Sequence, residues 1–187
     1  MPIRPAKKSD YKSIAPLIVQ AMSDLVVKFT KNSELKNAIP VFEFFFQEKA
    51  NQYSYENTLV YEENGEILGS ITGYDGSRLD ELRTPFLDHL LEKFGFEETP
   101  EDEAEVGEFY LDTVSVSHLH QGKGIGRKLI ETMIQIAKEK RFDKVGLLVD
   151  VENPTAKKLY ERIGFKVVKT KTLMGGQYEH LTYEISN

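Results

Sequence analysis

One stretch in the second half of the chain constrains the fold more than any other. A strand-like run at residues 108–117 leads into a glycine-rich loop, His-Gln-Gly-Lys-Gly-Ile-Gly-Arg-Lys at 120–128, and a helical pattern follows directly. Glycines at alternate positions let backbone N–H groups converge on one point, and the following helix aims the positive end of its dipole there. The segment therefore predicts an anion-binding site on a framework of strands and helices.

The helix after this loop has one apolar face, which predicts that it packs on a sheet. Its apolar residues recur at the three- and four-residue spacing of a helix, and charged residues occupy the other positions. The alternative is a glycine-rich turn that merely starts an amphipathic helix. The apolar residues are Ile125, Leu129, Ile130, Met133, Ile134, Ile136 and Ala137.

The glycine spacing does not fit the two common nucleotide-binding motifs. A P-loop places Gly-Lys-Ser/Thr four residues after its first glycine, and a dinucleotide fingerprint reads Gly-x-Gly-x-x-Gly. Counted from Gly122, the last glycine of that fingerprint would stand where the chain has Arg127. A nucleotide-binding module that uses the same loop is therefore a weaker alternative.

The strand-like run changes phase partway along, which predicts a β-bulge. Phe109 and Leu111 place apolar side chains at odd positions, whereas the two later valines stand at even positions. Because side chains alternate with a period of two, the phase shifts only where an extra residue is inserted. We expect this bulge near Asp112 or Thr113, with unpaired N–H and C=O groups and a gap to the neighbouring strand.

The rest of the chain alternates strand and helix patterns around one insertion at about residues 75–105. The sequence of the insertion predicts a helix near 82–94. The acidic tail that follows is expected to be a mobile, solvated loop, and its acidic residues are Glu97, Glu98, Glu101, Asp102, Glu103 and Glu105. Asn153 before Pro154, and Gly164 ten residues later, mark the start and end of another helix. The other predicted strands are 3–5, 58–62 and 67–74 around an Asn-Gly turn, 145–151, and 165–173 and 178–185 around Gly175-Gly176.

Two motifs resemble the GNAT superfamily of N-acyltransferases. The first is Gln-x-x-Gly-x-Gly at Gln121, Gly124 and Gly126, which follows a strand as the acyl-CoA loop of that superfamily does. The second, at 153–167, contains Asn-Pro-x-Ala, Leu-Tyr and Ile-Gly-Phe. With the strand at 108–117 they cover roughly the last half of the chain, in the order of the family. The N-terminal half and the acidic insertion match no pattern.

The resemblance implies a GNAT-like α/β (α+β) fold over residues 1–187 as a single domain that carries the acidic insertion. Such a fold has a central mixed, mostly antiparallel sheet of about six or seven strands, flanked by about four or five helices. Its fourth and fifth strands splay apart. In the family, the pantetheine arm of the cofactor enters this gap and pairs with the backbone as an added strand does.

The resemblance also implies acetyl-CoA as co-substrate, with no metal. In the family the loop amides bind the CoA pyrophosphate, and the strand before the loop holds the thioester. For each lysine near the loop, such as Lys123, the alternative to a ligand contact is a solvated surface charge. Asn153 is first of all a helix cap. The cofactor-binding residues expected on this basis are Val114, Val116, Gln121, Gly122, Lys123, Gly124, Ile125, Gly126, Arg127 and Asn153.

Three residues are candidates for the chemistry. Tyr160 matches the tyrosine that many family members place near the CoA sulfur as general acid, although an aromatic ring there also fills a helix–sheet interface. Glu108 and Asp112 are candidate general bases, and an exposed carboxylate is the alternative for each. Because the chain has no cysteine, a cysteine acyl-enzyme is excluded and direct attack in a ternary complex is expected. His118 and His120 lack a third metal ligand, so they are expected at the surface.

Composition limits the partners. The net charge of −6 repels nucleic acid and favours a basic acceptor. No run approaches the roughly 20 apolar residues of a membrane span, and no signal peptide is recognisable, so a cytoplasmic protein is expected. A homodimer is possible by analogy with the family.

The sequence thus predicts an N-acetyltransferase that acts on a primary amine of a small molecule or peptide. A non-catalytic acyl-CoA sensor with the same loop is the alternative. The acceptor and the acyl-chain preference are not readable from the sequence.

Overall fold

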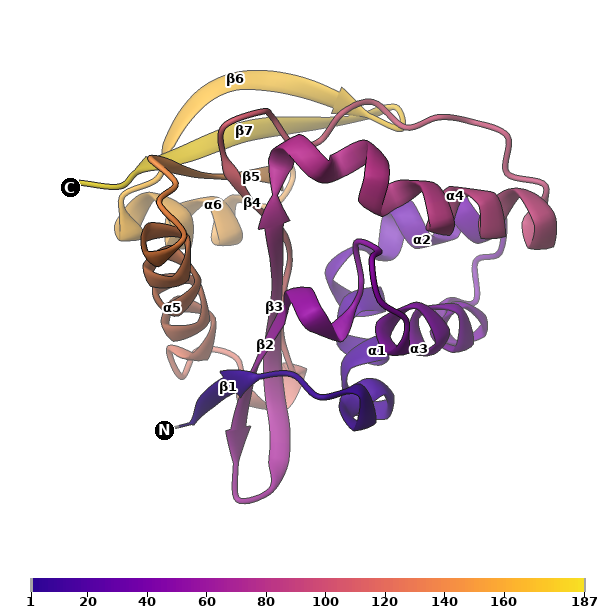
Figure 1. The fold of residues 1–187 in the computed structure, drawn as a ribbon, viewed down its shortest axis with the longest axis horizontal. Coiled ribbons are helices and arrows are strands. Elements are labelled where there is room, and N and C mark those ends of the chain that lie inside the picture. The colour runs from indigo at the N-terminus through magenta and orange to yellow at the C-terminus, as the bar shows by residue number, and fades with distance from the viewer. Residues whose placement is uncertain (1, 187) are drawn as a thin grey trace.

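A seven-stranded sheet with the order β1-β2-β3-β4-β5-β7-β6 organises the computed structural model, which describes residues 2–186 (Figure 1). All neighbouring strands are antiparallel except β4 and β5, which are parallel. This confirms the expected mixed, mostly antiparallel sheet. The strands are β1 (Ile3–Pro5), β2 (Thr58–Glu63), β3 (Glu66–Asp75), β4 (Phe109–Val116), β5 (Lys144–Asp150), β6 (Lys166–Leu173) and β7 (Gly176–Glu184).

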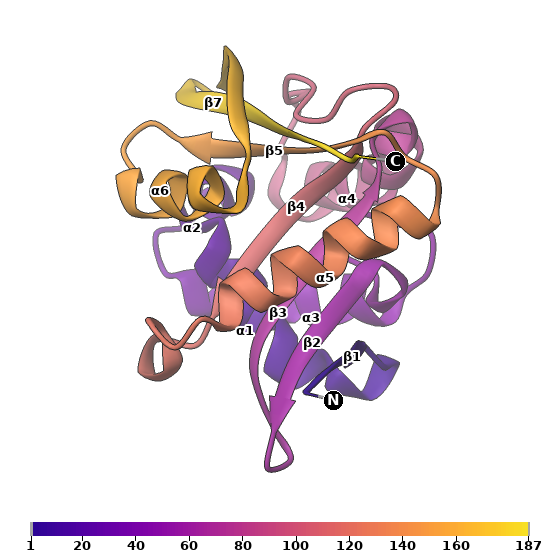
Figure 2. The same cartoon turned by 90° about the vertical axis from the view of Figure 1, so that its left-hand side faces the viewer.

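Helices cover both faces of the sheet, with α5 and α6 on one face and the N-terminal helices on the other (Figures 1 and 2). Within residues 2–186 there are six α-helices rather than four or five, because the backbone leaves the helical region at Met22 and divides one N-terminal helix in two. They are α1 (Tyr11–Ala21), α2 (Ser23–Thr30), α3 (Ile39–Gln47), α4 (Leu79–Phe94), α5 (Ile125–Glu139) and α6 (Pro154–Ile163).

No single helix in the described part of the chain is both long and apolar enough to cross a membrane. The segments Lys8–Ala21 and Ser23–Thr30 pass that test together by length and composition, but they meet at an angle of 96°.

Each face of the sheet has its own apolar core. On the α1–α4 side, aromatic rings pack edge to face, with 5.6 Å between the centroids of Phe29 and Phe86. On the other side, α5 buries Leu129 and Ile130 completely against the sheet, as its apolar periodicity predicts. The Asn64-Gly65 hairpin forms as expected, with both residues at positive φ (54° and 81°).

The predicted bulge is present in β4. Thr72 of β3 pairs with Thr113, and the next residue, Gly73, pairs with Leu111, so Asp112 is the extra residue. Side chains change faces at this point.

The bulge is also where β4 and β5 part. Their pairing comprises Phe109 with Val145, Tyr110 with Gly146 and Leu111 with Leu147 in the described chain. Beyond these pairs β4 continues beside β3, and β5 continues beside β7. The two strands run apart toward the loop before α5 and toward α6 (Figure 2). The expected splay between the fourth and fifth strands is therefore confirmed.

Two expectations need correction. The hairpin between β6 and β7 turns at Met174 and Gly175, one residue earlier than the sequence suggested. More importantly, the acidic tail of the insertion is solvated only in part: Glu97, Glu98, Glu101 and Asp102 are exposed as expected, but the loop is anchored to the β6–β7 hairpin. The carboxylate of Glu101 accepts the backbone N–H of Met174 at 2.8 Å, and Lys171 donates to the carbonyl of Asp102 at 3.1 Å.

Lysines of β6 hold the last part of this tail. Glu105 forms ion pairs with Lys169 and Lys171, and Ala104 beside it is buried. Partial burial opposes ionisation, but hydrogen bonds from the two lysines outweigh it and lower the pKa of Glu105 to about 2. A run of acidic residues reads as solvated in the sequence only because its basic partners lie on a distant strand.

Candidate active site

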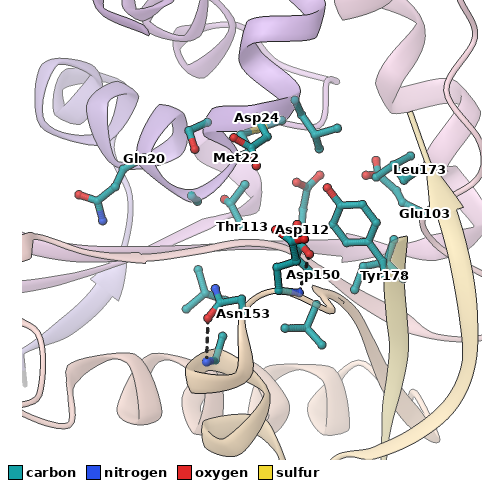
Figure 3. Close-up of a pocket in the computed structure, with 18 of the residues that line it drawn as sticks. Gln20, Met22, Asp24, Glu103, Asp112, Thr113, Asp150, Asn153, Leu173 and Tyr178 are labelled. Carbon is teal, nitrogen blue, oxygen red and sulfur yellow. Dashed lines mark hydrogen bonds between the residues drawn. The ribbon is translucent and has the colours of Figure 1, made fainter. Parts of the chain in front are cut away.

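A cavity of about 500 Å³ opens where β4 leaves β5 (Figure 3). Its walls come from the α1–α2 junction, the acidic insertion, β4, the end of β5, the start of α6 and the β6–β7 hairpin. The residues at its wall that bear on the chemistry are Asp24, Glu103, Asp112, Thr113, Val114, Asp150, Asn153, Tyr160 and Tyr178.

The backbone of β4 turns free hydrogen-bonding groups toward the opening. The N–H of Ser117 donates to the carbonyl of Leu68 on the β3 side, at 2.8 Å. Along a strand, the N–H and C=O groups of successive residues point to opposite edges. Val114 and Val116 therefore present their backbone groups to the side that β5 has left, where the sequence predicted them.

One of these groups already has partners. The carbonyl of Val116 accepts from Nε2 of Gln20 at 2.9 Å and from Nε2 of Gln121 at 3.2 Å. Gln121 thus fastens the loop to the end of β4. Gln20, from α1, was missed in the sequence because no motif surrounds it, and it also donates to the hydroxyl of Ser115 at 2.9 Å.

The glycine-rich loop has the geometry of an anion cradle. Gly122 and Gly124 adopt left-handed backbone conformations, with φ of 76° and 79°, that favour glycine. Gly124 is the N-cap of α5, and among the described residues no side chain caps it. The first N–H groups of α5 have no intrahelical partner, so they remain available to a ligand.

The side chains of the loop contribute unequally. Ile125 is buried in the core, so only its backbone can face a ligand. Arg127 pairs through Nε with Glu131 at 2.7 Å. Lys128 places its Nζ 5.6 Å from the centroid of the Tyr61 ring, and the side chain of Lys123 is exposed. Local positive charge is therefore present beside the cradle despite the negative net charge.

Asn153 begins α6 as the sequence predicts. Its side-chain oxygen accepts the N–H of Ala156 at 3.1 Å, and Pro154 follows in the first turn. The same residue lies at the wall of the cavity, so a capping role and contact with a ligand are compatible.

The position of Tyr160 is compatible with both of the roles considered for it. Its ring packs against Phe165, with 6.0 Å between centroids, and it also lines the cavity. Burial raises the pKa of its phenol to about 12, so the hydroxyl is protonated at neutral pH.

Asp112 and Glu103 form a bridged carboxylate pair. The hydroxyl of Tyr74 donates to Asp112 at 2.8 Å. Nε2 of Gln52 lies 2.6 Å from Glu103, 3.0 Å from the Tyr74 hydroxyl and 3.4 Å from Asp112. Burial, and then the charge of Glu103, raises the pKa of Asp112 well above its usual range, although the Tyr74 bond opposes this. Burial also raises the pKa of Glu103.

Glu108 occupies a different environment. Its carboxylate is fully buried, 3.0 Å from Nε2 of His180, and it accepts the N–H of Glu105 at 2.9 Å. It sits directly over Gly146, where an added Cβ would lie 2.1 Å from Oε2. Glu108 is not among the residues that line the cavity, so the structure separates the two carboxylates that the sequence treated alike.

The histidines do not assemble a metal centre at the loop. In the described chain, one group can bring three ligand atoms within 4.8 Å of one another: Glu105, Glu108 and His180. Two lysines already neutralise Glu105 in this group. His118 instead lies 3.5 Å from Nε2 of Gln121.

Comparisons with known proteins agree with this geometry. The model of the acetyltransferase (GNAT) family matches residues 20–165. A solved structure described as an acetyltransferase is 34% identical, with a TM-score of 0.80 and coverage of 98% of this chain and 99% of that one. An N-acetyltransferase from Staphylococcus aureus Mu50 is 26% identical, with a TM-score of 0.80 and coverage of 97% and 99%.

Similarity to a curated relative is more local. Mycothiol acetyltransferase from Corynebacterium aurimucosum is 38% identical over 69 residues, which are 37% of this chain and 22% of the relative. The match therefore spans about a fifth of that protein's length.

Proposed function

Because the chain belongs to the acetyltransferase (GNAT) family, we propose that it transfers the acetyl group of acetyl-CoA to a primary amine of a small molecule or peptide, by direct attack in a ternary complex. The observation that carries this proposal is the opening between β4 and β5, because β4 runs along it from a cavity lined by Tyr160 and Asp112 toward the glycine-rich cradle.

The cofactor would use the backbone of both elements. The pyrophosphate would accept hydrogen bonds from the free N–H groups around Gly122, Gly124 and Gly126, with Lys123 nearby. The pantetheine arm would run along the open edge of β4, beside Val114 and Val116. This arrangement needs no positive net charge, since backbone dipoles supply the attraction.

The reaction would begin with attack of a neutral amine on the thioester carbonyl. The N–H of Val114 would stabilise the oxyanion that forms, because a backbone donor fixed at the opening needs no reorganisation. The carbon–sulfur bond then breaks, and the CoA thiolate leaves with a hydrogen bond from Tyr160. The nitrogen gives up its extra proton to solvent and the thiolate takes up a proton from solvent, so the products are a neutral amide and CoA thiol.

The raised pKa of Tyr160 refines its role. A phenol of pKa about 12 gives its proton to a thiolate whose parent thiol has a pKa of about 8.5 only at a cost on the order of 5 kcal/mol. We therefore assign Tyr160 the role of hydrogen-bond donor to the leaving sulfur rather than that of an acid which ionises fully.

Asp112, with Glu103 beside it, is the proposed proton acceptor. Deprotonating an alkylammonium of pKa about 10.4 at pH 7 costs near 4.6 kcal/mol, and a carboxylate with a raised pKa accepts that proton more readily than an ordinary one. Glu108 is not assigned this role, because its carboxylate is enclosed with His180 outside the cavity.

Isothermal titration with acetyl-CoA tests the cradle. Gly124→Asp places a side chain and a negative charge at a positive-φ position of the loop, and we expect at least a tenfold loss of affinity. Gly65→Asp is the matched control, since Gly65 has a similar φ of 81° at the remote hairpin and open space around it. Wild-type protein that does not bind acetyl-CoA, or unchanged binding in Gly124→Asp, would contradict the proposal.

A free-thiol assay with a panel of amines then tests turnover. Release of CoA thiol that depends on an amine supports acetyl transfer. Tight binding of acetyl-CoA without thiol release against amines or peptide N-termini would instead favour the acyl-CoA sensor.

A further inference from the structure

Resting on the proposed acetyl transfer, we propose that the acceptor is a small diamine or polyamine. One ammonium group would react beside Asp112 and Thr113. A second would be held at a separate anionic site formed by Asp24 and Asp150 around Tyr178.

The wall of the cavity is strongly negative. Among the described residues that line it there are five carboxylates and no lysine, arginine or histidine. Mutual repulsion in a partly desolvated space disfavours five ionised groups unless cations enter. The carboxylates come from four separate segments, with the last two at the end of β5 and in the turn that follows it: Asp24, Glu103, Asp112, Asp150 and Glu152.

These carboxylates divide into two sets by their partners. Glu103 and Asp112 receive hydrogen bonds from Gln52 and Tyr74. Asp150, in contrast, accepts the backbone N–H of Glu152 at 2.8 Å. Within residues 2–186 neither Asp24 nor Asp150 has a cationic side chain in ion-pair distance.

The second set consists of Asp24 and Asp150, which lie near the part of the cavity that Tyr178 lines. Figure 3 shows Asp24, Asp150 and Tyr178 reaching the cavity from different walls. Burial, followed by the charges of Asp150, Asp24 and Glu103, raises the pKa of the Tyr178 phenol. A phenol oxygen among carboxylates is a site for an ammonium group, which donates to both.

A separate observation indicates a donor at the reacting end. Thr113 lines the cavity wall, and its hydroxyl oxygen is buried without a hydrogen-bond partner among the described residues. Buried polar atoms are normally paired. An ammonium or amine beside Asp112, the preceding residue, would donate to this oxygen.

The volume of the cavity and its negative charge restrict the class of acceptor further. About 500 Å³ must hold both the thioester end of the cofactor and the acceptor, which favours a small molecule. An amino acid would bring one more carboxylate into a wall that already has five, so we expect amino acids to bind poorly. A monoamine would leave the second set without a cation.

Three acceptors of equal chain length test this inference in the free-thiol assay. They are 1,5-diaminopentane, pentylamine, which lacks the second amine, and lysine, which adds a carboxylate. We expect kcat/KM for the diamine to exceed that for either of the others by at least tenfold. Asp24→Asn combined with Asp150→Asn is expected to reduce the ratio of diamine to pentylamine at least tenfold, chiefly through KM.

The matched control is Asp88→Asn combined with Glu97→Gln, because both residues are exposed outside this cavity and their loss changes the net charge by the same two units. It should preserve the ratio. Equal activity with pentylamine or lysine would overturn the second cation site while leaving acetyl transfer intact. Activity confined to peptide N-termini would overturn the diamine as well. Failure of every amine and peptide, despite cofactor binding, would instead overturn the proposed function.

Discussion

The hydroxyl of Tyr74 donates a 2.8 Å hydrogen bond to the carboxylate of Asp112, the one residue of β4 that has no partner on β3. The bulge therefore does two things at once. It opens the strand toward the cavity, and it turns a carboxylate to the face where Tyr74 and Gln52 hold it.

Removing this bond gives a prediction with a defined sign. The Tyr74 bond favours the ionised form of Asp112, so Tyr74→Phe raises the pKa of Asp112 further. The base is active when deprotonated, so the rise of kcat/KM with pH should move upward by about one to two pH units, since hydrogen bonds to charged groups contribute about 1.5–3 kcal/mol. The pH dependence of kcat/KM for the wild type and for Tyr74→Phe measures this shift. Tyr53→Phe, which removes a buried hydroxyl outside the Asp112 bond, is the control, and an unmoved profile would exclude Asp112 as the base.

Tyr160→Phe tests the leaving-group role. The ring and its packing against Phe165 remain, whereas the donor to sulfur is lost. We expect kcat to fall about 10- to 100-fold, because a hydrogen bond to a charged group contributes about 1.5–3 kcal/mol, with little change in acetyl-CoA affinity or melting temperature. If the melting temperature falls and kcat does not, Tyr160 is only a packing residue.

Two glycine substitutions should differ sharply in their effect on the free energy of unfolding. Gly146→Ala would place a Cβ 2.1 Å from the buried carboxylate of Glu108 and should destabilise the fold by about 2–3 kcal/mol. Gly126→Ala meets its nearest atoms at 3.7 and 3.8 Å and lies in α5, so it should be neutral or stabilising by up to about 1 kcal/mol. Urea unfolding compares them, and equal effects would contradict the close approach at Gly146.

The anchored insertion predicts a pH dependence of stability. The pKa of Glu105 is about 2 in the folded protein and about 4.3 when unfolded, so its ion pairs stabilise the fold above pH 4.3. This contribution is lost as pH falls toward 2. With screening, Glu105→Gln should cost about 1 kcal/mol at pH 6 and almost nothing near pH 2. Denaturant unfolding at both pH values gives the difference, and a cost independent of pH would contradict the pairing with Lys169 and Lys171.

The elements proposed to hold the cofactor were readable from local sequence. A phase shift between Leu111 and Val114 predicts the bulge, and the loop glycines and the Asn153 cap predict the starts of α5 and α6. Each of these signals lies within a few residues of the feature it specifies.

The acceptor side was not readable in this way. Gln20, Gln52, Glu103 and Tyr178 meet only through the tertiary fold, and none lies in a motif. Glu108 and Asp112 looked equivalent because burial is not encoded in their immediate neighbours. Gly146, in the middle of an apolar strand, is a sequence sign of close approach, but only the structure identifies Glu108 as the residue that packs on it.

The three-residue parallel pairing of β4 with β5 has a consequence for dynamics. The sheet consists of two blocks, β1–β4 and β5–β7, joined by a ladder with few rungs. A cofactor that forms hydrogen bonds with the edge of β4 and packs against β5 would supply connections between the two strands that the polypeptide itself lacks. Amide hydrogen exchange at Val114 and Val116 should therefore slow when acetyl-CoA is added, and the two blocks should unfold more nearly as one.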